Sequence, residues 1–265
     1  PDQAYSLRDD HLSVASNQIG RTNLLKQVNR PLGATIALEY DRVGNTYAMP
    51  QSRWVMSKVT VDDGHSGDGV DVQKTSYTYS GGNYNRFERD FYGFRTVTEK
   101  HLGIPSANDV YRKVVSTYLN GNYYTKGLEL SEQTLSGGGN IYRDTTNTYK
   151  LRDIYGSIDT TVDPVALDGD ANAVAYANST YFPMLTRTDH TFYEGGLTGS
   201  KSTYTSQIYD ALGNITRFVD AGDTGPADDV EAIIGYSGDD SICLANYIIG
   251  KPLTIEVRGG GQLMR

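Results

Sequence analysis

The sequence predicts an all-β protein, built as one extended antiparallel sheet of hairpins. Three observations favour this fold class: the composition, an alternation of apolar and polar residues, and a turn fragment that recurs along the chain. The 265 residues include 21 Tyr and 29 Gly, and only 38% are hydrophobic. Tyr, Thr and Val favour strands, Gly and Asn favour turns, and the low apolar share is unusual for a compact enzyme.

Alternation of period two marks five strands, because successive side chains of a strand point to opposite faces. Each stretch has strand length and is bounded by Gly, Asn, Asp or Pro. The stretches are 34–40 (ATIALEY), 54–61 (WVMSKVTV), 74–80 (KTSYTYS), 110–119 (VYRKVVSTYL) and 253–257 (LTIEV). Helical signals are scarce. Residues 226–234 (PADDVEAII), with an early Pro and acids in the first turn, predict one short helix.

A repeated fragment explains how the strands connect. Residues 40–45 read YDRVGN and residues 209–214 read YDALGN, and two looser copies are RDFYG at 89–93 and RDIYG at 152–156. All four keep an Asp and a Gly three residues later. The motif positions are Tyr40, Asp41, Gly44, Asp90, Gly93, Asp153, Gly156, Tyr209, Asp210 and Gly213.

Asp first and Gly fourth is a type I turn preference, in which the Asp side chain bonds the backbone two residues on. Each copy is therefore expected to be a hairpin turn between two strands. A lone hairpin is barely stable, so hairpins in series should pair side by side into one sheet. The spacing between copies is irregular, which predicts insertions and argues against a propeller of equal blades.

Candidate sites for chemistry are weak. None of the four His has metal-ligand spacing to another His or to Cys243. The stretch 62–71, which contains DGHSGDG, is not GxSxG and is expected to be a hairpin tip. Residues 136–140 (SGGGN) predict a turn. Residues 168–172 (DGDAN) resemble a calcium loop, but Ala173 and Ser179 stand where Gly and Glu are needed, so neither a metal nor another cofactor is expected.

The acids at 88, 90 and 99 make a glycosidase conceivable. Arginines at 86, 89 and 95 lie between them, so cross-strand ion pairs are the favoured interpretation, and the protein is not expected to be an enzyme. The hydrolase alternative would require that loss of Glu88 abolish an activity without loss of fold. The tyrosines could also stack on sugars, which leaves an extracellular domain that binds glycans or a host receptor as the alternative function.

Charge and targeting signals narrow the class further. A net charge of −8 argues against nucleic acid as the partner. No apolar run is long enough to span a membrane, no signal peptide is visible, and one Cys excludes an internal disulfide framework. The start at Pro1 suggests a piece excised from a longer protein.

Several segments together resemble a known family. Residues 209–222 (YDALGNITRFVDAG) are similar to the YD repeat of Rhs-type proteins. The order of three further segments resembles the B component of bacterial Tc insecticidal toxin complexes and related plasmid-encoded virulence proteins. These segments are 23–33 (NLLKQVNRPLG), 50–59 (PQSRWVMSKV) and 77–97 (YTYSGGNYNRFERDFYGFRTV).

The resemblance implies a structural role. In that family, YD-repeat hairpins form a sheet that spirals into a hollow shell around a toxic C-terminal polypeptide. The implied arrangement is one β-rich shell segment over 1–265, with a pre-repeat region to about residue 100, Rhs-like hairpins after it and an inserted loop near 165–180. The implied partners are the rest of the parent chain, a C-type toxin component and the enclosed polypeptide. The protein would be made in the cytoplasm and secreted. The family's self-cleavage motif has no counterpart here.

Overall fold

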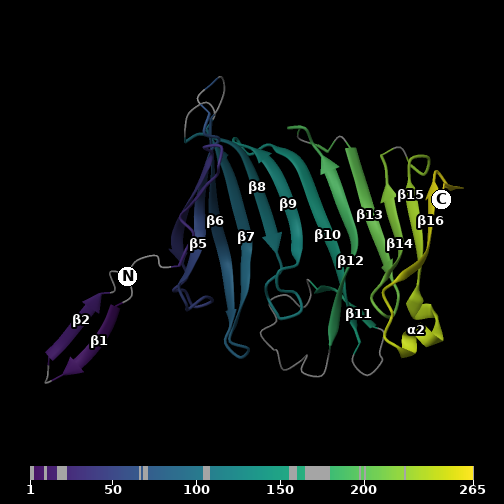
Figure 1. Cartoon of the computed structure of the whole chain (residues 1–265), viewed down its shortest axis with the longest axis horizontal. Helices are drawn as coiled ribbons and strands as arrows, with labels where there is room; N and C mark the ends of the chain where they lie inside the picture. Colours follow the sequence, from purple (N-terminus) through teal and green to yellow (C-terminus); the bar gives the residue numbers. More distant parts are fainter. Residues whose placement is uncertain are drawn as a thin grey trace.

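The protein is one broad antiparallel sheet, and a computed structural model shows how its strands follow one another (Figure 1). The structure describes residues 3–8, 11–16, 23–65, 67, 71–103, 108–154, 160–164, 180–196, 198–199, 201–223 and 225–264. Of the predicted features, Gly156 and the calcium-like and inserted loops at 165–179 lie outside these residues.

Fourteen strands lie side by side in chain order from β3 to β17, and a fifteenth, β11, pairs with β10. The strands are β3 (Gln27–Asn29), β4 (Thr35–Val43), β5 (Arg53–Asp62), β6 (Val72–Asn85), β7 (Asp90–Leu102), β8 (Val110–Tyr118), β9 (Glu129–Ser136), β10 (Ile141–Asp153), β11 (Thr160–Val162), β12 (Tyr181–Phe192), β13 (Lys201–Tyr209), β14 (Ile215–Ala221), β15 (Val230–Tyr236), β16 (Pro252–Gly259) and β17 (Gln262–Leu263). The predicted all-β antiparallel fold is confirmed. A separate hairpin is formed by β1 (Gln3–Arg8) and β2 (His11–Ser16).

All five alternating stretches are strands, and most extend beyond the alternation. The stretch at 74–80, for example, is the middle of the fourteen-residue β6. Its continuation at 80–83, which has the composition of a turn, is also strand. The predicted tip at 62–71 is confirmed, since Asp63 N donates to Asp71 O and the Asp62 and Asp63 carboxylates accept from Gly64 N and His65 N. The turn at 136–140 is confirmed as well, with Gly139 N donating to Ser136 O.

The predicted helix at 226–234 is wrong. Pro226 to Asp228 form a turn, and Val230 begins β15, which pairs with β14 on one side and β16 on the other. Two neighbouring strands offer the segment more backbone bonds than an isolated helical turn could. The helix of the described C-terminal half is instead α2 (Ser241–Ala245), after the 3₁₀ turn η3 (Ser237–Asp239). The Asp240 carboxylate caps α2 by accepting from Ile242 N and Cys243 N.

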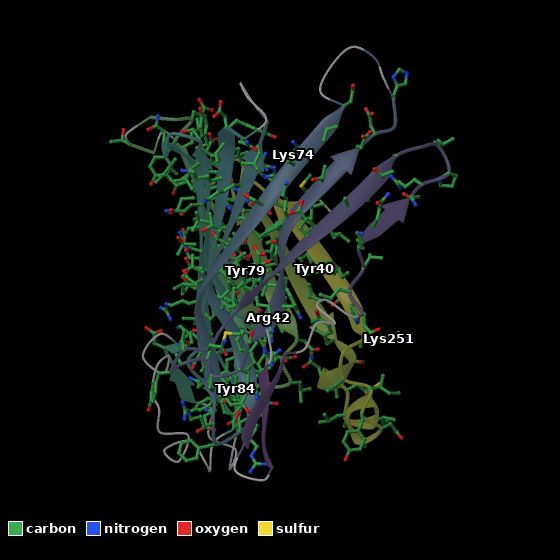
Figure 2. All side chains as sticks on the ribbon, turned by 90° about the vertical axis from the view of Figure 1, so that its left-hand side faces the viewer. Tyr40, Arg42, Lys74, Tyr79, Tyr84 and Lys251 are labelled. Carbon is green, nitrogen blue, oxygen red and sulfur yellow. The ribbon has the colours of Figure 1, made fainter. Side chains whose placement is uncertain are left out.

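The sheet is curved. Figure 2 shows the middle strands (teal) on one side, with the N-terminal strands (purple) and the C-terminal strands (yellow) both bent toward the other. The end of the sheet that carries α2 and the β4–β5, β6–β7 and β8–β9 connections, at the bottom of Figure 1, is called the lower rim below.

Burial is concentrated near the lower rim. Among the described residues only seven apolar side chains are buried: Met49, Tyr92, Leu119, Leu151, Pro164, Met184 and Ala221. Most other strand residues are half-exposed. A domain of this length normally buries a core between two layers of secondary structure. Here no second layer covers the described sheet.

Candidate functional site

The best-packed part of the described chain is a group at the lower rim, called the rim cluster: Met49, Tyr92, Leu119, Asn120 and Thr125. Each is at most 5% exposed. Three segments meet there: two connections, the β4–β5 loop at 44–52 and the β8–β9 loop at 119–128, and the start of β7. Segments distant in sequence are thus tied together at one end of the sheet.

Asn120 is the central polar group of the rim cluster. Its Nδ2 donates to Gly81 O at 2.8 Å and to Gly93 O at 2.9 Å, and its backbone O accepts from Asn83 Nδ2 at 2.7 Å. Gly81 and Gly93 have φ of +65° and +99°, which other residues rarely adopt. A buried amide that satisfies two such carbonyls is costly to replace.

Charged groups surround the cluster. The Tyr92 hydroxyl donates to Glu88, and burial, followed by the Glu88 carboxylate, raises the pKa of Tyr92. Lys126 Nζ lies 2.6 Å from Asp90 Oδ2, and this hydrogen bond lowers the pKa of Asp90. Lys126 also lies 4.3 Å from the centre of the Tyr123 ring. Glu99 meets His101 at 2.9 Å. The three acids therefore contact a tyrosine, a lysine and a histidine, where cross-strand pairs with arginines were expected.

Asp90 and Gly93 do not form the expected turn. Both lie in β7, and Gly93 pairs with Asn83 beside a bulge at Tyr92. The turn lies four residues earlier, at 86–89, because the Asn85 side-chain O accepts from Phe87 N and Glu88 N and Arg89 has φ of +55°. The hydrogen bonds of the Asn85 side chain therefore determine the position of the turn, and the Asp-x-x-Gly pattern at 90–93 does not.

Tyr40, Asp41 and Gly44 also depart from that expectation. Tyr40 and Asp41 lie inside β4 and pair with Met56 and Val55. Gly44 begins a loop that runs to residue 52, in which Thr46 N donates to Met49 O at 3.0 Å. The loop carries Met49 into the rim cluster, where Tyr84 N donates to Ala48 O. Asp153 lies at the end of β10, opposite Thr160 of β11 and Tyr181 of β12.

Tyr209, Asp210 and Gly213 form a tight turn between β13 and β14. One Asp210 carboxylate oxygen accepts from Leu212 N at 2.9 Å and Asn214 N at 2.8 Å, and the other accepts from Asn214 Nδ2 at 2.9 Å. Gly213 has φ of +89° and lies under the Phe182 ring. The Arg152 guanidinium donates to the Asp210 carbonyl, which ties the turn to β10.

The two faces of the sheet differ in chemistry in the C-terminal half. Because side chains alternate, the register places three ion pairs on one face, here called the charged face. They are Arg187–Asp189, Arg217–Glu231 and Arg258–Glu256. The opposite face, called the tyrosine face, carries Tyr209, Phe218, Ile234 and Val257. Both faces remain partly exposed.

A hollow of about 330 Å³ opens at the lower rim beside the rim cluster. Its most exposed rings are Tyr47, at 89%, and Phe87, at 84%. The Arg86 guanidinium stacks 4.8 Å from the centre of the Tyr47 ring and donates to Tyr47 O. Asn85 lines the hollow too, but its side chain already caps the 86–89 turn and bonds Tyr92.

Metal and membrane sites find no support in the residues described. Across them no group of three His, Cys, Asp or Glu side chains could hold a metal ion. His190 Nδ1 lies 3.1 Å from Thr145 Oγ1, and His65 lies at the hairpin tip. The described part of the chain also contains no helix that is long and apolar enough to cross a membrane.

Comparison with known proteins gives one consistent result. Residues 3–126 match the family model described as the middle/N-terminal region of the insecticide toxin TcdB. The chain resembles a Tc toxin B component. A search of the curated proteins gave no match.

Three solved structures share the B-component-like fold. The TcdB2–TccC3–Cdc42 crystal structure matches with a TM-score of 0.59 and 12% identity, over 96% of this chain and 17% of that one. TcdB2–TccC3 without its hypervariable C-terminal region gives 0.58 and 12%, over 90% and 15%. The Photorhabdus luminescens Tc holotoxin pore gives 0.62 and 11%, over 89% and 15%. The B-component-like chain thus spans only 15–17% of these chains' lengths, and at such identities the likeness concerns the fold alone.

Proposed function

We propose that this chain is a structural wall segment of a secreted Tc-type toxin component. Its hairpins would form part of a β-shell that encloses a cytotoxic polypeptide and protects it until delivery to a host cell. The observation that carries the proposal is the single curved sheet of fourteen strands with so small a core. The proposal assigns the chain no catalysis.

An isolated sheet of this kind is physically incomplete. Among the described strands, β3 and β17 each have a neighbour on one side only, and unpaired strand edges attract further strands. Side chains on both faces of the sheet are partly exposed to solvent. This exposure fits a wall between two compartments better than it fits one layer of a packed β-sandwich. The chain continues as one sheet across residue 100, so the pre-repeat region and the later hairpins would be parts of one wall.

The proposed partners follow from the comparisons. The similar solved chains are in complexes with TccC3, so a C-type component is the expected partner of the protein that carries this wall. The remaining partners would be other strands of the same shell and the enclosed polypeptide. Extracellular action is proposed on the same ground, because the holotoxin pore is among the similar structures.

The test uses two neighbouring residues of β13 that point to opposite faces. Thr205 pairs with Thr188, Ser206 pairs with Arg187, and both are half-exposed. Thr205→Cys and Ser206→Cys would be made singly in the full-length protein with Cys243→Ser. The protein, assembled with its C-type component, would be treated with a small maleimide and with a polyethylene-glycol maleimide too large to enter a closed shell.

The proposal expects a one-sided result. Both cysteines should react with the small reagent, and only one should react with the large reagent until the assembly is denatured. Equal reaction of both cysteines with the large reagent in the intact assembly would contradict a closed wall. Failure of either cysteine to react with the small reagent would indicate that its face is packed against another layer, which also contradicts the proposal.

A second candidate function rests on the hollow at Tyr47, Arg86 and Phe87. Exposed rings beside a guanidinium could bind a sugar, as in an adhesion module. The polar groups of the hollow are partly used already, because the Asn85 side chain caps the 86–89 turn and Arg86 donates to Tyr47 O. Glycan-array binding that is abolished by Tyr47→Ala would favour this function, and no binding by the native protein would exclude it for the glycans tested.

A further inference from the structure

A row of β-bulges crosses the sheet near the lower rim. In six pairs of neighbouring strands, the strand that leaves the rim carries one residue without a partner in the register. Each such residue widens the ladder locally and increases the twist of its strand. The extra residues are Ser57, Tyr92, Leu130, Thr186, Thr216 and Leu253.

Each bulge faces a tyrosine. In all six strand pairs, the partner of the residue just before the extra residue is Tyr. These facing tyrosines are Tyr40, Tyr84, Tyr118, Tyr149, Tyr209 and Tyr236. With 21 Tyr among 265 residues, six random positions would contain less than one on average. The recurring unit of the sheet is therefore a tyrosine opposite a bulge, and only two of the six units also carry the YD dipeptide.

Three tyrosine hydroxyls donate to a backbone carbonyl in, or two residues before, the preceding strand. Tyr40 donates to Leu25 O at 2.9 Å, Tyr79 to Met56 O at 2.8 Å and Tyr209 to Leu185 O at 3.0 Å. In each case the position of the last residue pair between the two strands is the same. The paired residue on the tyrosine's own strand lies three residues before the tyrosine, and its partner lies two residues after the acceptor. The last pairs are Gln27–Ala37, Lys58–Ser76 and Arg187–Ser206. Figure 2 shows Tyr40 and Tyr79 at one level of the sheet, between Lys74 and Tyr84.

Met56 and Leu185 are also the residues just before a bulge. Each therefore has a tyrosine on both sides: Tyr40 opposite Met56 with Tyr79 bonded to its carbonyl, and Tyr149 opposite Leu185 with Tyr209 bonded to its carbonyl. The hydroxyl therefore adds a hydrogen bond to the preceding strand beyond the last paired residues, next to its bulge. In β6 the two roles fall to Tyr79 and Tyr84, because β6 is long and carries Gly81 and Gly82 between them.

At two other strand pairs an asparagine amide donates to the preceding strand close to the position that the tyrosines use. At β9–β10 the ladder ends at Ser131–Thr146, and Asn147 Nδ2 donates to Glu129 O at 2.9 Å, the acceptor that the pattern specifies. At β7–β8 the ladder ends at Thr96–Thr117, and the residue three positions on is Asn120, which donates to Gly93 O next to the bulge. At both strand pairs, as with the tyrosines, a side chain beyond the last paired residue donates to a carbonyl of the preceding strand near its bulge.

We propose that Tyr40, Tyr79 and Tyr209 are positioning residues that couple the bulge of one hairpin to the next and so set the curvature of the sheet. When the bulges of successive hairpins are aligned across the sheet, their additional twist accumulates from strand to strand, and this accounts for the bend in Figure 2. This role does not depend on the shell proposal, because it concerns the register of any sheet built from these hairpins.

The same rule specifies what a strand added to β16 must carry. The β16 bulge is at Leu253, so the Pro252 carbonyl is the next acceptor in the row. The β16–β17 register pairs Arg258 with Leu263. If a strand continued along β16 in that register, its second residue after Arg265 would pair with Thr254, two residues after the acceptor. The donor, three residues further on, would be the fifth residue after Arg265. A longer chain with this register should therefore have a tyrosine or an asparagine there, and an apolar aliphatic residue would contradict the rule.

Hydrogen–deuterium exchange of single hydroxyl deletions tests the positioning role. Tyr209→Phe and Tyr79→Phe keep the ring and remove the donor. Loss of one hydrogen bond predicts exchange about fivefold faster at the amides around the acceptor, Leu185 to Arg187 in the first variant and Met56 to Lys58 in the second. The controls are Tyr77→Phe, two residues before Tyr79 on β6, and Tyr142→Phe, an exposed tyrosine on β10.

Each outcome decides the matter. Faster exchange confined to the acceptor segment of each variant, with the controls unchanged, supports the proposal. Equal exchange in variant and control contradicts it. So does faster exchange spread evenly over the sheet, because that would mean a general loss of stability. The Tyr40→Phe, Tyr79→Phe and Tyr209→Phe triple variant should also give a flatter protein by small-angle scattering, and an unchanged scattering profile would contradict the link to curvature.

Discussion

The two YDxxGN copies have the same letters and different backbones. At Tyr209 the motif closes on itself, with the Asp210 carboxylate holding three N–H groups of the turn. At Tyr40 the strand continues through Val43 and opens into a loop that runs to residue 52. In both copies, however, the tyrosine hydroxyl donates to a backbone carbonyl on the side of the preceding strand, Leu25 just before β3 in one copy and Leu185 in β12 in the other. The tyrosine is therefore the invariant part of the motif, and the turn is the variable part.

The difference has a physical cause in what lies beyond each motif. The first copy is followed by Ser52, which accepts from Arg42 Nε, and by Trp54, against which Arg42 stacks at 5.3 Å. These contacts extend β4 past the Asp. Met49 is then buried in the rim cluster at 3% exposure. The second copy is also tied to the sheet, through Arg152 at the Asp210 carbonyl, but Leu212 of its turn is 42% exposed and the Asp210 carboxylate closes the turn locally. Tertiary contacts override the local preference in one copy and not in the other.

The largest expected effect comes from removing the anchor of the first copy. Met49→Ala should lower the free energy of unfolding by about 2–4 kcal/mol, because it leaves a cavity among the residues of the rim cluster. The matched control is Leu212→Ala in the second copy, where the side chain is 42% exposed. Its expected cost is below about 1 kcal/mol. Urea denaturation measures both, and equal costs would remove the distinction between an anchored and a self-closed copy.

A smaller effect is expected from the motif aspartates. Asp210→Ala should cost about 1–2 kcal/mol through the hydrogen bonds that close the turn. Asp41→Ala, within β4, should change stability by no more than about 0.5 kcal/mol. Asp210→Asn keeps an acceptor oxygen and should recover part of the loss. A similar loss at both aspartates would show that they act alike despite their different settings.

The smallest effect is a dependence on pH at the lower rim. The Lys126 ammonium lowers the pKa of Asp90 in the folded protein. A depressed carboxyl pKa stabilises the fold above the unfolded value of about 3.8, and this contribution is lost as the pH falls through the folded value. Lys126→Met should therefore reduce the difference between the urea midpoints at pH 7 and pH 3. An unchanged difference would show that the ion pair does not contribute.

The strands were predictable because alternation alone specifies them, as at 54–61 and 253–257. The turns were predictable only where they close locally, as at Asp210. Asn85 displaced the turn at 89–93, and the two neighbouring strands made 230–234 a strand despite its helical signals. The facing tyrosines were visible only as a high Tyr count. Their shared position opposite a bulge depends on the pairing register of the strands. Each bulge shifts that register by one residue, so the tyrosines do not recur at a fixed spacing in the sequence.

Electron cryomicroscopy of the full-length protein with its C-type component tests the central claim most directly. The account predicts that the sheet from β3 to β17 continues into paired strands at both edges, stays curved, and turns one face toward an enclosed volume. A sheet whose two edges are left unpaired, or whose faces pack against a second sheet with no enclosed volume, would contradict it.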